Sequence, residues 1–294
     1  MAQARSQQFL DDFELVNLYL IKRIRYQMLY WLADDWHFRR ATSRLHAFTE
    51  HFVQKAIAQR QGEDHHAECG LLSALAFGTP DRAQLRNQTM AILAAARDTT
   101  AGFLGWCFVR LALHQDIFHE LRNAVRSTFG EPEHLDFDRL HRCAPLQRFL
   151  KEVLRLHPPV PVNNRRAKVD TQLPTGGGAH GDAPVAVRKG QVVIYSVYLM
   201  HRRVDLWGED AVDFRPGRWV HDFPAWQYLP FSGGPRACLG QQFALAEASY
   251  VVARLAMECD AIRPVNTLYM SQLRKGLGLT MWPADGVPVR LHKA

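Results

Sequence analysis

Cysteine is scarce in this 294-residue chain, and no two cysteines form a C-x-x-C pair. The five cysteines stand far apart, at positions 69, 107, 143, 238 and 259. An odd number of widely spaced cysteines is unlike a secreted disulfide framework and indicates a reducing compartment. At most one or two of these thiols are therefore expected to carry chemistry.

Long apolar runs are also missing. A membrane-spanning helix needs roughly 18 uninterrupted apolar residues, whereas the most apolar early stretch, 15–32, is interrupted by Asn17 and Lys22. The first eight residues are polar and carry a single charge, on Arg5, so they lack the basic and apolar segments of a signal peptide. We expect this chain to contain no membrane span.

The overall composition excludes further classes of protein. Apolar residues make up 47% of the chain, aromatic residues 11% and charged residues 22%, which is typical of a globular protein with one large domain or two modest ones. A disordered tail and a collagen-like fibre are ruled out. The net charge of +7 suits an acidic protein partner, a membrane surface or nucleic acid equally well. Because the basic residues are not interleaved with aromatic ones, nucleic-acid binding is not expected.

Apolar periodicity predicts a mainly α-helical chain. The order Thr79-Pro80-Asp81 is typical of a helix start, and a helix from there to residue 114 would be roughly 50 Å long, enough to run through a domain core. No repeat or linker divides the chain, and a minor β-sheet is expected beside the helices. The other predicted elements are two or three helices within 9–60, helices over 116–129, 145–157 and 239–258, a strand over 191–199, and C-terminal hairpins.

The strongest local pattern is F-S-G-G-P-R-A-C-L-G at 231–240. It places one cysteine, Cys238, directly before a predicted helix. Backbone N–H groups of the turn and the positive end of the helix dipole would stabilise a thiolate there. Most free cysteines are simply small core residues, but the surrounding glycines supply close backbone approach rather than packing. The pattern therefore predicts a soft, anionic metal ligand.

This segment resembles the haem-binding loop of the cytochrome P-450 superfamily, F-x-x-G-x-R-x-C-x-G. Its five fixed positions are all filled, by Phe231, Gly234, Arg236, Cys238 and Gly240. A chance match in a chain of this length has a probability of about one in ten thousand. The resemblance implies haem b as the cofactor, with Cys238 as the iron ligand, Arg236 as a partner of a haem propionate and Phe231 as an aromatic wall beside the sulfur. Thiolate ligation favours O–O cleavage.

A second pattern is K-E-V-L-R, in which Glu152 and Arg155 lie three residues apart and share one helix face. Such a pair alone usually lies on a solvent-exposed helix surface. Here it precedes the turn H-P-P-V-P, as in the P-450 family, and F-R-P-G-R-W resembles the family segment that holds a third partner, Arg218. The resemblance implies a buried Glu-Arg-Arg network that holds the thiolate loop and is not catalytic. Gly217 stands where the family commonly has glutamate.

The third pattern, A-A-R-D-T-T-A at 95–101, lies midway along the long predicted helix. A threonine there can bond back to the carbonyl four residues earlier while the aspartate faces solvent, so a structural role stays open. The segment also resembles the oxygen-activating stretch of the P-450 family, [AG]-G-x-[DE]-T-[TS]. The resemblance implies that Thr99 hydrogen-bonds the distal oxygen and that Asp98 connects it to solvent, as positioned proton donors. Ala96 stands where glycine is usual, so the resemblance leaves open the rate of the reaction and how it divides between products.

Three weaker features complete the set. By position in the strand after the prolines, Arg165 resembles the residue that meets a second haem propionate in fungal members of the family. The glycines at 176–178 lack the Lys-Ser/Thr of a P-loop, so a flexible hairpin is expected. His65, His66 and Cys69 could hold a metal in principle, but without a second ligand pair a solvated loop is expected.

The resemblance extends from about residue 80 to the C-terminus, the haem-binding core. Residues 1–79 resemble, more weakly, the pocket-covering helices of fungal alkane- and fatty-acid-hydroxylating members. A complete family member is considerably longer on its N-terminal side, so we expect one incomplete P-450 domain over 1–294. Full-length relatives are anchored in the endoplasmic reticulum membrane, which is the localisation that the resemblance implies.

The resemblance implies a haem-thiolate monooxygenase that inserts one atom of O2 into a C–H bond of an apolar substrate, with alkanes or fatty acids as the substrate class. NADPH would act indirectly, through a reductase, and the basic excess suits docking to an acidic reductase. One alternative is a truncated, non-catalytic fragment that does not retain haem. A haem-thiolate isomerase or dehydratase is a third, against which the pair Asp98 and Thr99 argues.

Overall fold

The computed structural model describes residues 2–61, 70–131 and 135–294. The histidines and the cysteine at 65, 66 and 69 lie outside these ranges. The chain divides into two compact units, Met1–Thr99 with Leu277–Leu279, and Thr100–Gly276 with Thr280–Ala294. Each unit has a hydrophobic cluster of its own.

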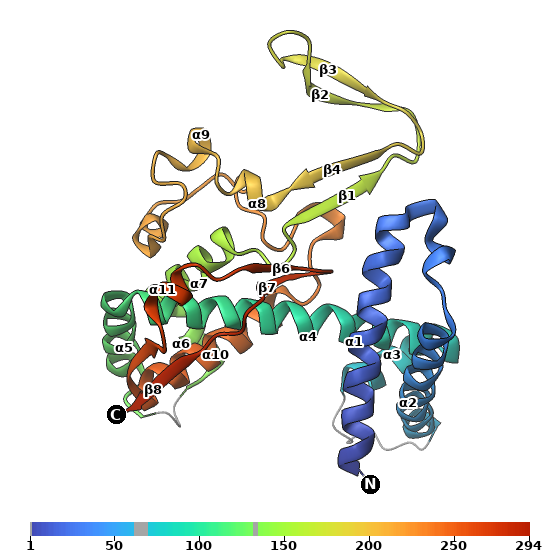
Figure 1. The fold of residues 1–294 in the computed structure, drawn as a ribbon, viewed down its shortest axis with the longest axis horizontal. Helices are drawn as coiled ribbons and strands as arrows, with labels where there is room; N and C mark the ends of the chain where they lie inside the picture. The colour runs from blue at the N-terminus through green and yellow to red at the C-terminus, as the bar shows by residue number, and fades with distance from the viewer. Residues whose placement is uncertain (1, 62–69, 132–134) are drawn as a thin grey trace. The chain divides into compact units, whose positions relative to one another are not determined.

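The first unit is built from helices (Figure 1). They are α1 (Ala2–Tyr26), the 3-10 turn η1 (Gln27–Ala33), α2 (Trp36–Gln61), α3 (Leu71–Gly78) and the first part of α4 (Arg82–Leu113), which continues into the second unit. Val53 and Ala56 of α2, Ala76 of α3 and Leu85 of α4 form its buried cluster. The prediction of two or three helices within 9–60 is confirmed.

The long helix α4 starts later than the sequence predicts. Asp81, rather than Thr79, caps it: the Asp81 carboxylate accepts from the backbone N–H groups of Ala83 at 2.9 Å and Gln84 at 3.2 Å. Thr79 instead accepts from the Asp81 N–H at 3.2 Å. Both side chains are good N-caps. The aspartate caps the helix because its carboxylate lies within hydrogen-bond distance of the first free N–H groups. Pro80 therefore precedes the helix.

The second unit packs its core between three helices. These are α5 (Gln115–Phe129), α7 (Ala144–Leu156) and α10 (Gln241–Glu258), with α6 (Phe137–Arg142) beside them and the end of α4 contributing buried residues. On α7 the residues Leu146, Phe149, Leu150 and Val153 recur at helical spacing and are all buried. Burial of each such side chain stabilises the fold by roughly 1.5–3 kcal/mol. Periodicity predicted these three helices to within two residues at each end.

The strands form small two-stranded sheets (Figure 1). Antiparallel pairs join β1 (Val162–Arg166) to β4 (Val192–Ser196), β2 (Thr171–Gly177) to β3 (Ala183–Val187), and β5 (Cys259–Pro264) to β8 (Val289–Lys293); β6 (Lys275–Leu277) pairs with β7 (Met281–Pro283). The hairpin predicted at the triple glycine is confirmed as β2–β3, where Gly176 and Gly178 have φ of +114° and +74°.

The strand predicted over 191–199 is shorter than expected. It ends at Ser196, whose hydroxyl accepts from the Leu199 N–H at 3.2 Å and caps the one-turn helix α8 (Val197–Met200). The remaining short elements are α9 (Val204–Trp207), η3 (Pro216–Val220), η4 (Gly234–Arg236) and α11 (Thr267–Ser271). The fold is therefore mainly α with a minor β component, as predicted. Within the described ranges, no helix has the length and apolar character to span a membrane.

Candidate functional site

Cys238 lies in an exposed loop directly before α10. The loop is closed by hydrogen bonds from the Cys238 N–H to the Phe231 carbonyl at 2.9 Å and from the Ala237 N–H to the Gly234 carbonyl at 3.0 Å. The loop lies close to Trp226, because a Cβ at Gly233 would lie 2.8 Å from the far end of that exposed ring. The backbone thus turns tightly around the thiol, which is free and exposed to solvent.

The surface beside Cys238 is apolar and uncovered. Leu239 and Phe243 are 93% and 69% exposed, although single leucine and phenylalanine side chains usually gain from burial. A Cβ added at Gly240 would meet nothing within 4 Å. Arg236 makes no hydrogen bond or ion pair with any residue that the structure describes. Haem is a flat apolar group that carries a metal ion and carboxylates. The Cys238 thiol suits the metal, the open apolar surface suits the flat ring, and the unpaired guanidinium of Arg236 suits a carboxylate. These residues therefore fit haem.

Arg165 reaches the same loop from β1. Its Nη2 donates to the Ser232 hydroxyl at 3.2 Å, and the Tyr195 hydroxyl lies 3.3 Å from the same oxygen. The guanidinium also lies over the Tyr195 ring, 5.6 Å from its centroid. Its other partners are Asn163 and Asn164, and neither is a carboxylate. The structure therefore brings a second arginine without a carboxylate partner to the cysteine loop.

Glu152 and Arg155 of α7 are both fully buried. They form a bidentate pair, with Arg155 Nε and Nη2 donating to the two carboxylate oxygens at 2.9 and 2.8 Å. The remaining N–H groups of Arg155 donate to the backbone carbonyls of His201 at 2.8 Å, Ala211 at 2.5 Å and Asp213 at 2.9 Å. All five guanidinium hydrogens therefore have acceptors, as a buried charge requires.

The segment after Asp213 completes the network. Arg218 Nε donates to Glu152 Oε1 at 2.9 Å, and the Arg215 backbone N–H donates to the same oxygen at 2.9 Å. The Trp219 indole N–H donates to Oε2 at 2.9 Å. One carboxylate thus joins α7 to a segment more than sixty residues later. The segment F-R-P-G-R-W contains Trp219, but the sequence analysis gave a role in the network only to the charged residues.

His201 was missed altogether by the sequence analysis. Its imidazole is buried, with Nδ1 3.0 Å from the Arg155 carbonyl and Nε2 accepting from the Leu229 N–H at 3.0 Å. Burial, together with the charges of Arg155 and Arg202, lowers the pKa of His201 to about 3. A lone histidine after a strand carries no local signal of such a role, since both of its partners are distant in sequence.

Asp98 and Thr99 belong to the first unit, whereas the cysteine loop belongs to the second. Thr99 Oγ1 donates back to the carbonyls of Ala95 at 2.5 Å and Ala96 at 3.3 Å, which is the local bonding that the structural alternative predicts. Asn17 of α1 donates from Nδ2 to Asp98 Oδ2 at 3.0 Å. The acid is thus held by a side chain from a neighbouring helix and is not free in solvent.

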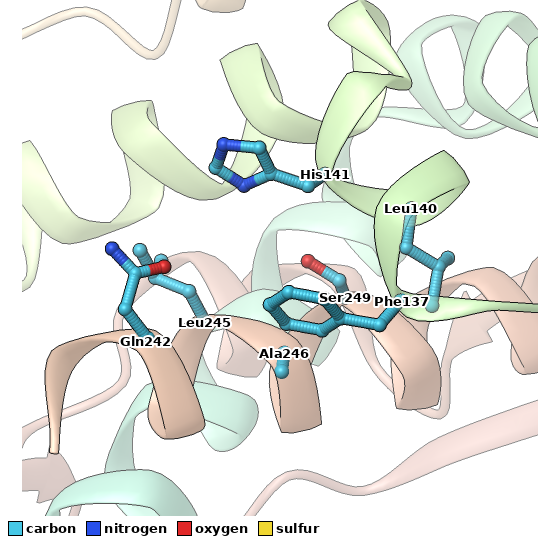
Figure 2. A pocket seen from close by; sticks show the side chains of 7 residues that line it. All are labelled: Phe137, Leu140, His141, Gln242, Leu245, Ala246 and Ser249. Carbon is cyan, nitrogen blue, oxygen red and sulfur yellow. The ribbon is translucent and has the colours of Figure 1, made fainter.

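A small cavity lies between α6 and α10 (Figure 2). Figure 2 shows His141 above the α10 side chains Leu245 and Ser249, with the Phe137 ring drawn over Ser249. Its volume of about 10 Å³ is that of a single water molecule, which is too small for an organic substrate. In the described part of the chain, no three His, Cys, Asp or Glu side chains are grouped as metal ligands. Among the residues that the structure describes, Cys238 remains the metal-ligand candidate that the sequence pattern supports.

Comparison with known proteins places these features in a family. The family model for cytochrome P450 matches residues 4–275. The chain is 43% identical to cytochrome P450 52E1 of Candida apicola, over 89% of this chain and 52% of that protein. It is 40% identical to cytochrome P450 52A1 of Candida tropicalis, over 97% and 54%, and 42% identical to cytochrome P450 monooxygenase alt2 of Alternaria solani, over 85% and 48%. The chain thus spans about half the length of the curated relatives it matches.

Proposed function

Because the chain belongs to the cytochrome P450 family, we propose that it provides the haem-binding core of a haem-thiolate monooxygenase. Such an enzyme inserts one atom of O2 into a C–H bond of an apolar substrate. The observation that carries the proposal is the exposed Cys238 in its closed loop, beside the uncovered Leu239 and Phe243 and the unpaired Arg236. We assign residues 80–294 to this core and residues 1–79 to the cover of the substrate pocket, within one domain.

Three side chains around the loop would hold the cofactor. Cys238 is the proposed axial ligand, and Arg236 and Arg165 are the proposed partners of the two carboxylates. Phe231, whose carbonyl accepts from the Cys238 N–H, would shield the sulfur from water. Bound haem supplies the oxidation chemistry, for which thiolate ligation favours cleavage of the O–O bond.

Asp98 and Thr99 would move protons for the reaction. The Thr99 hydroxyl can donate a hydrogen bond only after leaving the Ala95 carbonyl, to which it donates at 2.5 Å. The Asp98 carboxylate, which accepts from Asn17 at 3.0 Å, would receive protons from solvent and pass them on. Ala96 stands where the family pattern has glycine, and its carbonyl accepts from the Thr99 hydroxyl at 3.3 Å.

The Glu-Arg-Arg network has a structural role in this proposal. Glu152 is bonded to Arg155 within α7 and to Arg218 in η3, and neither arginine lies in the cysteine loop. The network therefore braces the segment that leads into the loop. Its charged groups are hydrogen-bonded to one another and to backbone carbonyls, so none of them is free to take part in catalysis.

A reductase would supply two electrons from NADPH, and an alkane or a fatty acid is the proposed substrate, following the fungal members that the sequence resembles. We further propose attachment to the endoplasmic reticulum membrane. The turn η1 supports contact with a bilayer, because Met28 and Trp31 are 88% and 57% exposed and the basic Lys22 and Arg25 precede them. Exposed aromatic and basic side chains favour the lipid–water interface.

The test is the carbon monoxide spectrum of the reduced, haem-reconstituted chain. We expect the strongly red-shifted Soret band of thiolate-ligated haem, lost in Cys238→Ser and kept in Cys143→Ser, which makes the same chemical change at a buried thiol. Failure of the chain to take up haem, or a band that survives Cys238→Ser, would refute the proposal. Those outcomes would favour the alternative of a non-catalytic fragment.

A further inference from the structure

His201 connects two segments of the second unit through both of its ring nitrogens. The Arg155 carbonyl can only accept, so Nδ1, at 3.0 Å, carries the proton. The Leu229 backbone N–H can only donate, so Nε2, at 3.0 Å, carries none. The two backbone partners thus define a neutral imidazole with a single tautomer. The ring joins the last turn of α7 to the chain just before the cysteine loop.

The segment that His201 reaches is where the cysteine loop begins. The Leu229 carbonyl accepts from the Ser232 N–H at 3.1 Å, and the Phe231 carbonyl accepts from the Cys238 N–H at 2.9 Å. Ser232 has a φ of +61°, which is unusual for a residue with a Cβ and needs support from its surroundings. The backbone from Leu229 to Cys238 is therefore a short series of hydrogen-bonded turns whose first amide is held by His201.

The imidazole itself has little freedom to move. Tyr228 stacks against it at a centroid distance of 5.3 Å and an interplanar angle of 24°, and the Trp207 ring meets its edge at 5.9 Å. The Tyr228 hydroxyl donates to the Lys151 carbonyl of α7 at 3.0 Å. The His201 carbonyl also accepts from Arg155 Nη1 at 2.8 Å. Ring and backbone of His201 are therefore both tied to the Glu-Arg-Arg network.

We propose that His201 is a positioning residue of the thiolate site, which couples α7 to the cysteine loop by holding the Leu229 amide. The effect of His201 on haem ligation rests on the proposed function, whereas its effect on the loop does not. The Glu-Arg-Arg network braces the preceding segment, and the His201 ring links the Arg155 backbone directly to the Leu229 amide at the start of the loop. A histidine suits the task because it donates and accepts at opposite ends of one rigid ring.

Three substitutions separate the two hydrogen bonds. His201→Gln keeps an acceptor at the distance of Nε2, His201→Asn keeps only a donor near Nδ1, and His201→Leu removes both polar atoms at similar size. His157→Leu is the matched control. His157 is also buried, stacks on Trp106 at 4.0 Å and accepts from Arg110, but it has no contact with Leu229.

The first measurement is hydrogen exchange of the Leu229 amide in the haem-free chain. Loss of one buried hydrogen bond should speed its exchange about tenfold in His201→Leu and His201→Asn. His201→Gln and His157→Leu should leave that amide near the wild-type rate. Unchanged exchange in His201→Asn, or equal acceleration in His157→Leu, would overturn the proposal. If His201→Leu does not fold, the comparison of the Asn and Gln variants still decides whether His201 holds the Leu229 amide.

The second measurement is the carbon monoxide spectrum of the same variants after haem reconstitution. We expect at least half of the thiolate-type band to be lost in His201→Asn and recovered in His201→Gln. Failure of the Gln variant to recover the band, while its Leu229 amide stays protected, would overturn the coupling to the thiolate. A wild-type chain without any thiolate-type band would refute the proposed function instead, and the exchange rates would still test the link to the loop.

Discussion

Substitution of Glu152 by glutamine should strongly destabilise the second unit. The carboxylate accepts five hydrogen bonds, three at Oε1 from Arg155, Arg215 and Arg218, and two at Oε2 from Arg155 and Trp219. A glutamine side chain must turn its NH2 group toward one of these two sets. Because all five partners are donors, the better orientation still loses two hydrogen bonds.

The loss of charge adds to this cost. Arg155 is fully buried, and Glu152 is the carboxylate to which it donates. Removing one member of a buried ion pair leaves an uncompensated charge, at a cost of about 3–5 kcal/mol. The whole free energy of unfolding of a domain is only about 5–15 kcal/mol. Glu152→Gln is thus expected to remove at least about a fifth of it.

The assay is urea denaturation of the haem-free chain, followed by tryptophan fluorescence, since the Trp219 indole bonds directly to Glu152. Glu247→Gln, at an exposed position of α10, makes the same chemical change without a buried partner and should alter the free energy of unfolding by less than about 0.5 kcal/mol. A loss below about 1 kcal/mol in Glu152→Gln, or equal losses in both variants, would show that the network does not stabilise the fold.

Three further outcomes follow from the described contacts. The pKa of His201 is lowered to about 3, so between that pH and its ordinary value near 6.5 only the unfolded chain binds the proton. The free energy of unfolding should therefore drop by up to about 1.4 kcal/mol for each unit by which the pH is lowered in this range, and His201→Gln should flatten that slope in urea titrations. Asp136→Ala removes the side-chain cap of α6 and should cost about 1 kcal/mol in the same assay, whereas an unchanged midpoint would contradict it. Gly233→Ala places a Cβ 2.8 Å from the far end of the Trp226 ring, which is 68% exposed and can turn into solvent. The substitution should therefore change the tryptophan fluorescence but cost less than about 1 kcal/mol, while Gly217→Ala, with nothing within 4 Å, should leave both fluorescence and melting temperature unchanged.

Helices and the cysteine loop could be predicted from the sequence because their signals are local. The apolar spacing of α7, which buries Leu146, Phe149 and Leu150, depends on residues within one or two turns. The pair Glu152 and Arg155 shares a face for the same reason, since three residues separate them. The loop around Cys238 is likewise defined by neighbours in sequence, so its pattern alone pointed to a thiolate ligand.

Element ends were less predictable because neighbouring residues compete for the same backbone groups. Thr79 and Asp81 can each cap a helix, and only the folded backbone shows that the aspartate takes the N–H groups of α4. Ser196 lies within a run of strand-forming residues, yet its hydroxyl caps α8 and ends the strand. In each case the hydrogen bonds of one capping side chain outweigh a preference that the surrounding residues share only weakly.

Apart from the contact of Glu152 with Arg218, which the family resemblance implied, the long-range contacts came only from the tertiary structure. Trp219 donates to Glu152 from 67 residues away, and His201 bonds to Arg155 and Leu229, which are 46 and 28 residues distant. No sequence period connects such positions, because packing brings them together. The sequence by itself determined the family and the helices, and it named Cys238 as the candidate ligand. The tertiary structure decided which buried donors and acceptors meet, since each must find a partner once water is excluded.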